Sequence, residues 1–421
     1  MRVKILIHKK SKFLTQNSQK MGNTYDKIQI VEPKFGSKIT RNIFELEELR
    51  DSNNLLRILD RSNINYWHVF FSFIPIFQTL ESIASARIEW NHTTVSEFIN
   101  KMYSNNKKWS KDEKIKEINN NIKARDYIDE IYNSWNLEIN RKFISELHIL
   151  LMKDLDPKEE WDYNPWKYRK KNVSISLSSH IPPDYTQVAS YMDELINFIN
   201  TNDDRMYDLI KIALIHHRFV WIHPFGNWNW RMVRLLTYAL FLKYWYAFNQ
   251  VNLMNTSSLF CLNREEYYKY LNIADWWDKE WLLKRCEFAT SSICAELKNI
   301  KKFFDIEFVD SILEKWIKKL RTEKEIDDKE ADILTLLYLK WQIDNKTVQK
   351  CFKYNTSIIS RKFRHLKEIW LLRNIEKTKQ YVPIYRNQIL FMDIYHNLIK
   401  EWFSSWSILD EPEWLSEVLP K

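Results

Sequence analysis

The sequence predicts a mainly α-helical protein with more than one domain. From about residue 40 onward, apolar side chains recur with the helical period, while the alternating pattern of a strand is rare. The 421 residues, with a hydrophobic content of 45%, are enough for two or three domains with sizeable cores. Because no run of about 18 apolar residues occurs, no membrane-spanning helix is expected.

Changes in composition divide the chain into successive parts. Residues 1–40 are polar and predict a weakly ordered lead-in. The parts that follow are a main helical block, a charged helical connector, a small helical unit and a tail, over residues 41–304, 305–329, 330–385 and 386–421. Within the main block, Val173-Ser-Ile-Ser-Leu177 alternates apolar and polar residues, which predicts a small β-hairpin on the helical scaffold.

The cysteines and the net charge restrict location and partners. Cys261, Cys286, Cys294 and Cys351 lack CxxC or metal spacing, so we expect buried thiols, and no secretory signal is evident. A cytoplasmic protein is the expectation. The net charge of +9 is concentrated at residues 351–380, where acidic residues are few. This excess is typical either of nucleic-acid binding or of an ordinary solvated helix face.

Glycine is scarce and tryptophan is abundant. The chain has 3 Gly and 19 Trp, whereas ordinary usage of about 7% would give roughly thirty glycines. Helices are predicted to end at Trp90, Trp245, Trp341 and Trp370, where glycine is the usual residue. We hypothesise that the gene uses the codon UGA for glycine, and that the printed sequence was translated with a genetic code in which UGA means tryptophan. A Trp-rich protein from an AT-rich genome would explain the Lys and Ile content but not these helix ends.

One loop carries the residues of a nucleotide site. The helical period of residues 208–220 breaks at His223-Pro-Phe-Gly-Asn-Trp-Asn-Trp-Arg231 and then resumes. The start of the second helix presents free N–H groups that bind anions. Arg231 and Arg234 share one helical face there, which favours a polyphosphate, and His223 is placed to act as a base. Taken singly, the histidine and the arginines would be ordinary structural residues, but here they occur together.

With Trp228 and Trp230 read as glycine, the loop becomes HPFGNGNGRMVR, which resembles the Fic family motif HPFx(D/E)GNGRxxR. The resemblance extends from about residue 75 to 300. Asn164-Pro-Trp-Lys-Tyr-Arg169 is similar to the family's PGxYR segment before the target-docking hairpin, and Asn263-Arg-Glu-Glu-Tyr-Tyr268 to its NRxxYY helix. The fold implied is a Fic-type helical bundle with a small β-hairpin flap.

The resemblance implies transfer of AMP from ATP to a Ser, Thr or Tyr hydroxyl of a protein, this protein itself included. His223 would then deprotonate the hydroxyl, Asn229 would hold the α-phosphate and Arg231 would bind the β- and γ-phosphates. The amides of Gly226–Trp230 would form an anion hole, and Tyr267 would line the adenine pocket.

The motif departs from the family at Asn227, where the family has an acidic Mg²⁺ ligand. A neutral amide oxygen still suits Mg²⁺ but brings no charge. If Trp228 and Trp230 are genuine, their indoles would occupy the phosphate space, and the protein would be a pseudoenzyme.

An inhibitory helix is also implied. Ser85 and Glu89 lie one turn apart on a helix expected at residues 78–90, and they resemble the inhibitory motif of some Fic proteins. By that resemblance Glu89 would pair with Arg234 and keep the ATP γ-phosphate out of place. Otherwise Glu89 is an exposed residue at a helix end.

Near the C-terminus the pattern predicts a winged helix-turn-helix. Two short helices, Asn345–Phe352 and Ser357–Ile369, are followed by segments that predict wing strands at 371–375 and 381–384. The candidate DNA-binding residues on the second helix are Ser357, Ser360, Arg361 and Arg364. Such units also serve as protein-docking elements.

The leading interpretation is an autoinhibited, ATP- and Mg²⁺-dependent protein adenylyltransferase with a winged-helix appendage, and a homodimer is left open. The alternative is a DNA-binding regulator with an inactive or nucleotide-sensing Fic-like domain.

Overall fold

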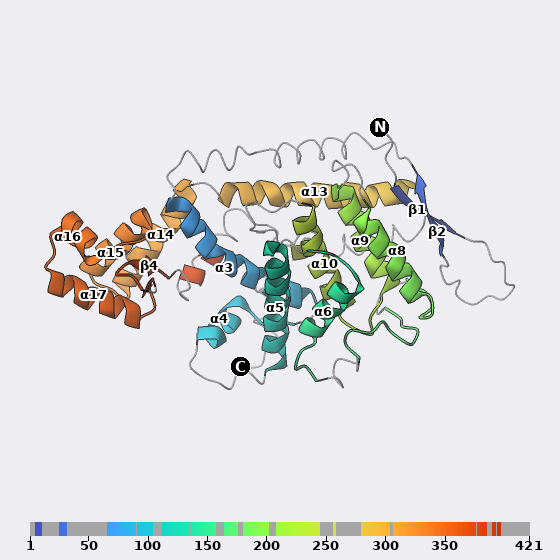
Figure 1. Ribbon diagram of the computed structural model, residues 1–421, viewed down its shortest axis with the longest axis horizontal. Coiled ribbons are helices and arrows are strands. Elements are labelled where there is room, and N and C mark those ends of the chain that lie inside the picture. Colours follow the sequence, from blue (N-terminus) through green and yellow to red (C-terminus); the bar gives the residue numbers. More distant parts are fainter. Residues whose placement is uncertain are drawn as a thin grey trace, which may run out of the picture.

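The computed structural model describes residues 5–10, 25–31, 65–89, 91–103, 112–134, 137–156, 164–175, 180–201, 208–244, 256–257, 279–303, 306–375, 377–384, 390–392 and 394–396. This part of the chain is mainly α-helical, as predicted, with two small two-stranded sheets (Figure 1). None of its helices is both long and apolar enough to cross a membrane.

Two consecutive helices form the centre of the main block. They are α9 (Asp208–Ile222) and α10 (Asn229–Lys243), and nearly every residue of both is buried. A helix that is buried on all sides must be enclosed by other elements. The enclosing helices are α5 (Glu113–Asn133), α6 (Arg141–Leu151), α8 (Val188–Asn200) and α13 (Lys279–Phe303). The loop between α9 and α10 is therefore held by two rigid elements.

Helix α3 (Asn65–Ile88) packs against α5 and α10 and is longer than the helix expected at 78–90. Pro75 lies inside it, although proline is typical of helix starts, and this explains why the sequence pattern missed the N-terminal half. Thr79 Oγ1 donates to the Pro75 carbonyl at 2.7 Å. A short helix, α4 (Val95–Tyr103), follows α3.

One prediction about strands needs correction. In the expected lead-in, β1 (Ile5–Lys10) and β2 (Tyr25–Val31) pair antiparallel, so this segment is not without structure. Both strands carry several β-branched residues, which favour extended pairing. Of the hairpin expected at 173–177, residues 173–175 are in no strand and 176–179 lie outside the described residues, so the hairpin stays a prediction.

Side-chain hydrogen bonds hold the residues just before the expected hairpin. Arg169 Nη1 donates to the Lys171 carbonyl at 3.0 Å. Asn172 Nδ2 donates to Asp184 Oδ2 at 2.9 Å, and Asn172 Oδ1 accepts the Tyr185 N–H at 2.9 Å.

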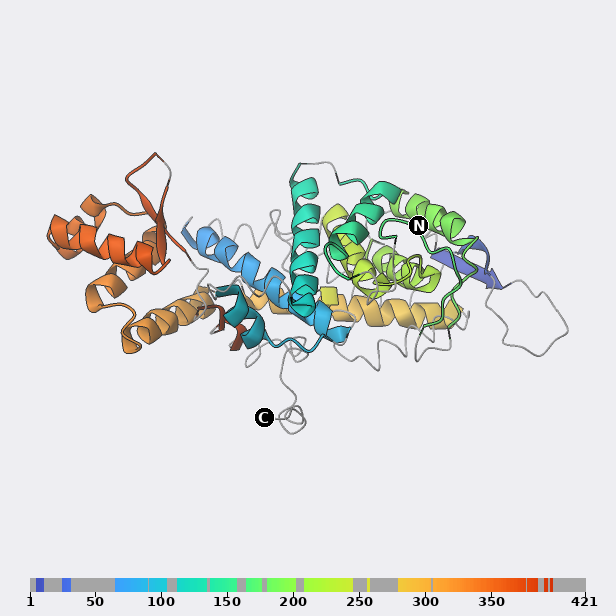
Figure 2. The same cartoon turned by 90° about the horizontal axis from the view of Figure 1, so that it is seen from below.

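The C-terminal unit lies at one end of the molecule (Figures 1 and 2). Helix α14 (Ile306–Thr322) leads into α15 (Asp328–Lys340), which contacts both α14 and α3. The two predicted short helices and the two wing strands are present as α16 (Asn345–Phe352), α17 (Thr356–Glu368), β3 (Leu372–Asn374) and β4 (Tyr381–Pro383), the strands pairing antiparallel.

The cysteines only partly match expectation. Cys286 and Cys294 are buried free thiols, as predicted, but Cys351 is exposed. It lies on the outer face of α16, whose short amphipathic pattern buries only Val348. Cys261 lies outside the described residues.

Candidate active site

The loop between α9 and α10 is closed by the side chain of Asn229. Its Nδ2 donates to the Phe225 carbonyl at 3.0 Å, and its Oδ1 accepts the Phe225 N–H at 2.9 Å. Two reciprocal bonds across four residues fix the curvature of the backbone. Asn229 therefore shapes the loop, and the contact with an α-phosphate implied by the resemblance remains a prediction.

Arg169 anchors the start of the loop, a role that sequence reasoning missed. Its Nε donates to the His223 carbonyl at 2.9 Å, and its backbone N–H donates to the Pro224 carbonyl at 2.9 Å. Burial lowers the pKa of Arg169 to about 10, so the side chain is still cationic at neutral pH. The signal was available, because Arg169 ends the Asn164–Arg169 segment already singled out.

His148 supports the other side of the loop. Its ring stacks on Phe225, with centroids 4.0 Å apart and 8° between the planes. Nδ1 accepts the Trp166 N–H at 3.3 Å, so Nε2 is the protonated nitrogen and donates to the Asn227 carbonyl at 3.3 Å. No sequence pattern marked His148, because a single buried histidine on a helix has no distinctive spacing.

His223 sits where α9 ends, with a positive φ of 50°. Desolvation lowers the pKa of its imidazole to about 3, against the raising effect of the Val220 carbonyl. The ring is therefore neutral at physiological pH, but a pKa this low makes it a weak base in the nucleotide-free protein. Its place at the start of the loop suits a general base for a hydroxyl, provided that the negative charge of a bound nucleotide raises this pKa.

Arg234 is bound by both residues of the expected inhibitory motif. Its Nη1 lies 3.0 Å from Glu89 Oε1, its Nε donates to Ser85 Oγ at 2.9 Å, and its Nη2 donates to the Ser85 carbonyl at 3.0 Å. The guanidinium is almost fully buried between α3 and α10. A phosphate that used this arginine would have to replace these contacts.

Arg231 also has a carboxylate partner, which the sequence did not predict. Its Nη2 donates to Glu117 Oε2 on α5 at 3.1 Å. Its guanidinium carbon lies 3.7 Å from the centroid of the Trp228 ring, within cation–π range. Both arginines of the motif are thus engaged within the protein.

Tryptophan occupies several backbone positions that suit glycine. Trp228 is the N-cap of α10 with φ 67° and ψ 12°, in the left-handed region. Trp166, Trp341 and Trp370 also have positive φ, at 78°, 63° and 58°. Of the helix-end tryptophans, Trp90 and Trp245 lie outside the described residues. Trp230, from the loop motif, is helical within α10. A non-glycine residue is strained in the left-handed region, which supports the codon hypothesis.

The donor set around the loop does not build a magnesium site by itself. Asn227 Oδ1 accepts the Trp228 N–H at 2.8 Å. Among the described residues, no group of three or more His, Cys, Asp or Glu side chains is placed to hold a metal. The loop therefore offers a metal ion one neutral oxygen, and ATP phosphates would have to supply most of the ligands. Tyr267, expected near the adenine, lies outside the described residues.

Comparison with known proteins agrees with this geometry. Residues 138–241 match the Fic/DOC family. A protein adenylyltransferase Fic of Aedes aegypti is 25% identical over 153 residues, which are 36% of this chain and 28% of the relative. One of Drosophila erecta is 30% identical over 108 residues, or 25% of this chain and 20% of the relative. The matches thus span about a quarter of these curated relatives.

Solved structures of Fic proteins are also similar. A Fic family protein from Desulfovibrio desulfuricans is 16% identical with a TM-score of 0.48, over 84% of this chain and 98% of that one. Fic-1 from C. elegans is 18% identical with a TM-score of 0.43, over 64% of this chain and 73% of that one. The family match covers both the loop and its two arginines, so this part of the chain is similar to the Fic/DOC family.

Proposed function

We propose that this protein transfers AMP from ATP to a hydroxyl side chain of a protein. The observation that carries the proposal is the loop itself: a neutral His223 lies at its start, and Arg231 and Arg234 lie in the first turns of the buried helix that follows. The adenylyltransferase relatives support this chemistry over the part of the chain that they match.

In the proposed reaction, the hydroxyl oxygen of a Ser, Thr or Tyr attacks the α-phosphorus of ATP. His223 takes the hydroxyl proton, the new P–O bond forms, and the bond to the β-phosphate oxygen breaks to release pyrophosphate. The N-terminus of α10 and the loop amides stabilise the negative charge. Magnesium would arrive with the nucleotide and neutralise phosphate charge there.

We also propose that Glu89 is a brake. Its ion pair with Arg234 is supported by two further bonds from Ser85, so α3 occupies the arginine that a γ-phosphate would use. Replacing such charge-assisted bonds has a real cost. Bound ATP would therefore sit unproductively until α3 shifts.

The proposed activity requires glycine at 228. An indole against Arg231 fills the space beside the loop amides, and phosphate oxygens need that approach. We therefore propose that the functional protein has glycine at residues 166, 228, 230, 341 and 370, encoded by UGA. UGG codons at these positions in the source genome would contradict this and favour a pseudoenzyme.

Labelling with ATP tests the activity. The glycine-restored protein, incubated with α-phosphate-labelled ATP and Mg²⁺, should transfer label to itself or to a partner protein. His223→Ala should lower the rate by about 10² to 10⁴, the usual contribution of a general base. His365→Ala is the matched control, since that histidine lies on α17 and bonds to Glu330 of α15. Unchanged labelling in His223→Ala would remove this residue from the mechanism.

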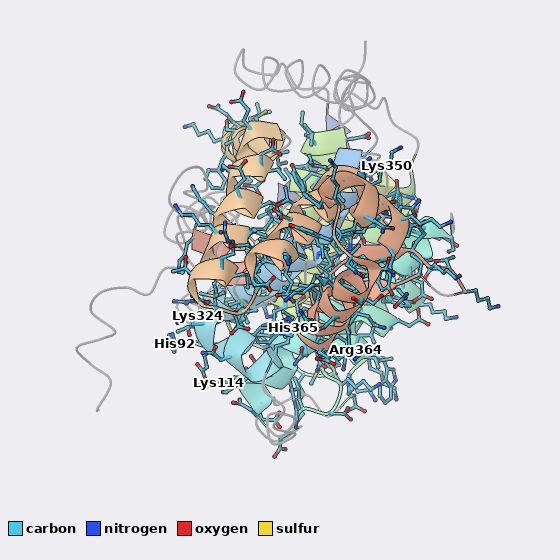
Figure 3. All side chains as sticks on the ribbon, turned by 90° about the vertical axis from the view of Figure 1, so that its left-hand side faces the viewer. His92, Lys114, Lys324, Lys350, Arg364 and His365 are labelled. Carbon is cyan, nitrogen blue, oxygen red and sulfur yellow. The ribbon has the colours of Figure 1, made fainter. Side chains whose placement is uncertain are left out.

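A second candidate function, duplex DNA binding, is supported by the exposed face of α17. Ser357, Ser360, Arg361 and Arg364 are all exposed on it. Exposed basic residues on the neighbouring wing extend the same charge, namely Arg373, Lys377 and Lys379. Figure 3 looks onto this end of the molecule, where Lys350 and Arg364 are labelled. A helix-turn-helix with a basic wing suits a major groove and its phosphates.

A further inference from the structure

We propose that Glu117 is a second inhibitory carboxylate, which holds Arg231 as Glu89 holds Arg234, and that Asn91 joins the two contacts. The inference rests on the proposed function, because it concerns regulation of the same phosphate site. It draws on residues of α5 and of the turn after α3, outside the motifs that identified the family.

The Glu117–Arg231 pair is placed to compete with ATP. The two side chains are mostly enclosed, with 16% of Glu117 and 7% of Arg231 exposed, and their N–O distance is 3.1 Å. An arginine that faces a carboxylate in such a site has its charge neutralised, and an incoming phosphate would meet the repulsion of Glu117. Nucleotide binding through Arg231 therefore requires Glu117 to turn away or to exchange its partner.

Asn91 fixes the position of Glu117. Its Nδ2 donates to Glu117 Oε2 at 2.7 Å, the same oxygen that binds Arg231, and also to the Lys114 carbonyl at 2.9 Å. Its Oδ1 accepts the Thr93 N–H at 3.2 Å and the Thr93 hydroxyl at 2.6 Å. The Nδ2 of this nearly buried amide thus seats the carboxylate at the start of α5, while its Oδ1 holds Thr93 ahead of α4.

Asn91 also belongs to the end of the inhibitory helix. It follows Glu89 by two residues, and its backbone N–H donates to the Ala86 carbonyl at 3.1 Å. If the end of α3 moved to release Arg234, Asn91 would be drawn away from Glu117 as well. The two carboxylates therefore act together: one displacement of α3 weakens the hold on both arginines.

Single and double variants test this in the glycine-restored protein. Glu117→Gln keeps the shape and removes the charge, and it should tighten ATP binding about tenfold in isothermal titration and raise the labelling rate. Asn91→Ala should act in the same direction but more weakly. The matched control is Glu113→Gln, since Glu113 lies on the same helix but pairs with Lys116.

A double-mutant cycle tests the coupling. If Asn91 connects the contacts, Glu89→Gly with Glu117→Gln should gain less in ATP affinity than the product of the two single gains. If the gain in ATP affinity of the double variant equals the product of the two single gains, the coupling is overturned. An ATP affinity in Glu117→Gln equal to that of Glu113→Gln would overturn the second brake.

The outcomes separate this inference from the proposed activity. Labelling that appears in Glu89→Gly but does not respond to Glu117→Gln or Asn91→Ala leaves the enzyme intact and removes the second brake. Tighter ATP binding in Glu117→Gln without labelling in any variant would keep the second brake and contradict the transferase. Should Glu117→Gln not fold, Asn91→Ala decides by the same titration, and unchanged ATP affinity there would overturn the proposal.

Discussion

Trp370 shows how a tryptophan side chain conflicts with a backbone conformation that suits glycine. The residue follows the C-cap of α17, its φ is 58°, and 74% of its surface is exposed. Its N–H donates to the Lys367 carbonyl, and the Leu371 N–H donates to the Leu366 carbonyl, the bonds of a helix end built around glycine. An indole there gains little from packing and strains the backbone.

We expect Trp370→Gly to raise the free energy of unfolding by about 1 kcal/mol, because glycine removes the strain of the left-handed conformation. Trp370→Ala removes the same indole but keeps a Cβ, so it should not share the gain. Urea unfolding of the three proteins measures the difference. Trp316→Gly is the opposite control, since Trp316 is buried in α14 and its loss should destabilise strongly. Equal stability of the Gly and Ala variants would count against a glycine position.

Helix α3 is the element through which regulation would act. It carries Ser85 and Glu89 to Arg234, and nearer its middle it reaches α5 through a second set of buried contacts. Gln78 Nε2 donates to Asp129 Oδ2 at 2.8 Å, and Glu81 lies 2.9 Å from Arg125. Buried polar groups that are paired in this way fix one arrangement of neighbouring helices.

Releasing the brake should raise activity. In the glycine-restored protein, Glu89→Gly should increase AMP labelling about tenfold, because Arg234 becomes available for a charge-assisted bond to the γ-phosphate. Adding Arg234→Ala to that variant should take the gain away. Glu97→Gly, in the exposed pair with Lys101, should change nothing. If Glu89→Gly left labelling and ATP affinity unchanged, the motif would be an ordinary helix end.

The contact between α3 and α5 should also depend on pH. Burial raises the pKa of Asp129 to about 6 from 3.8, although Tyr238 and Gln78 donate to it. The folded state then holds the proton more tightly than the unfolded state. The contribution of Asp129 to the free energy of unfolding is therefore fully present below about pH 4 and is lost as the pH rises to about 6.

The free energy of unfolding of the wild type, relative to Asp129→Asn, should therefore fall by about 2 kcal/mol between pH 4 and 6.5. Chemical denaturation across this range measures it. Asp126→Asn removes a second carboxylate whose charge raises the pKa of Asp129, and it should shift the pH dependence of the unfolding free energy only slightly. A difference between wild type and Asp129→Asn that is flat with pH would contradict the raised pKa.

On the scale of the whole molecule, the basic C-terminal unit contacts α3 through α15. Its two short helices and wing present their charge at the end of the protein, away from the α9–α10 loop (Figures 1 and 2). A partner bound at α17 would therefore not obstruct the proposed active site.

Duplex DNA should bind this surface with an affinity that falls steeply with salt. Arg361→Ala and Arg364→Ala should each weaken binding and, where the side chain contacts a phosphate, lower the salt slope by about 1. Fluorescence anisotropy with a labelled duplex measures both. Lys318→Ala on α14 removes an equal charge elsewhere and should have little effect. Affinity that is the same in all three variants would indicate a docking role for the unit instead.

The sequence by itself determined the features that depend on near neighbours. The helical spacing of apolar residues established the helical class, and turn residues located α16 and α17. The loop from His223 to Arg234 could be identified because its functional residues are close together in the sequence. The positions of Trp341 and Trp370 at helix ends were readable for the same reason, since a helix end is a local structure.

Only the tertiary structure decided which residues support and restrain the site. Glu117 is 114 residues from Arg231, and His148 is 79 residues from Asn227. A single acidic residue or histidine on a helix belongs to no sequence pattern from which its partner could be predicted. Packing of α3, α5 and α10 brings these side chains together, and burial then gives each contact its strength, because the same charges in water would be screened.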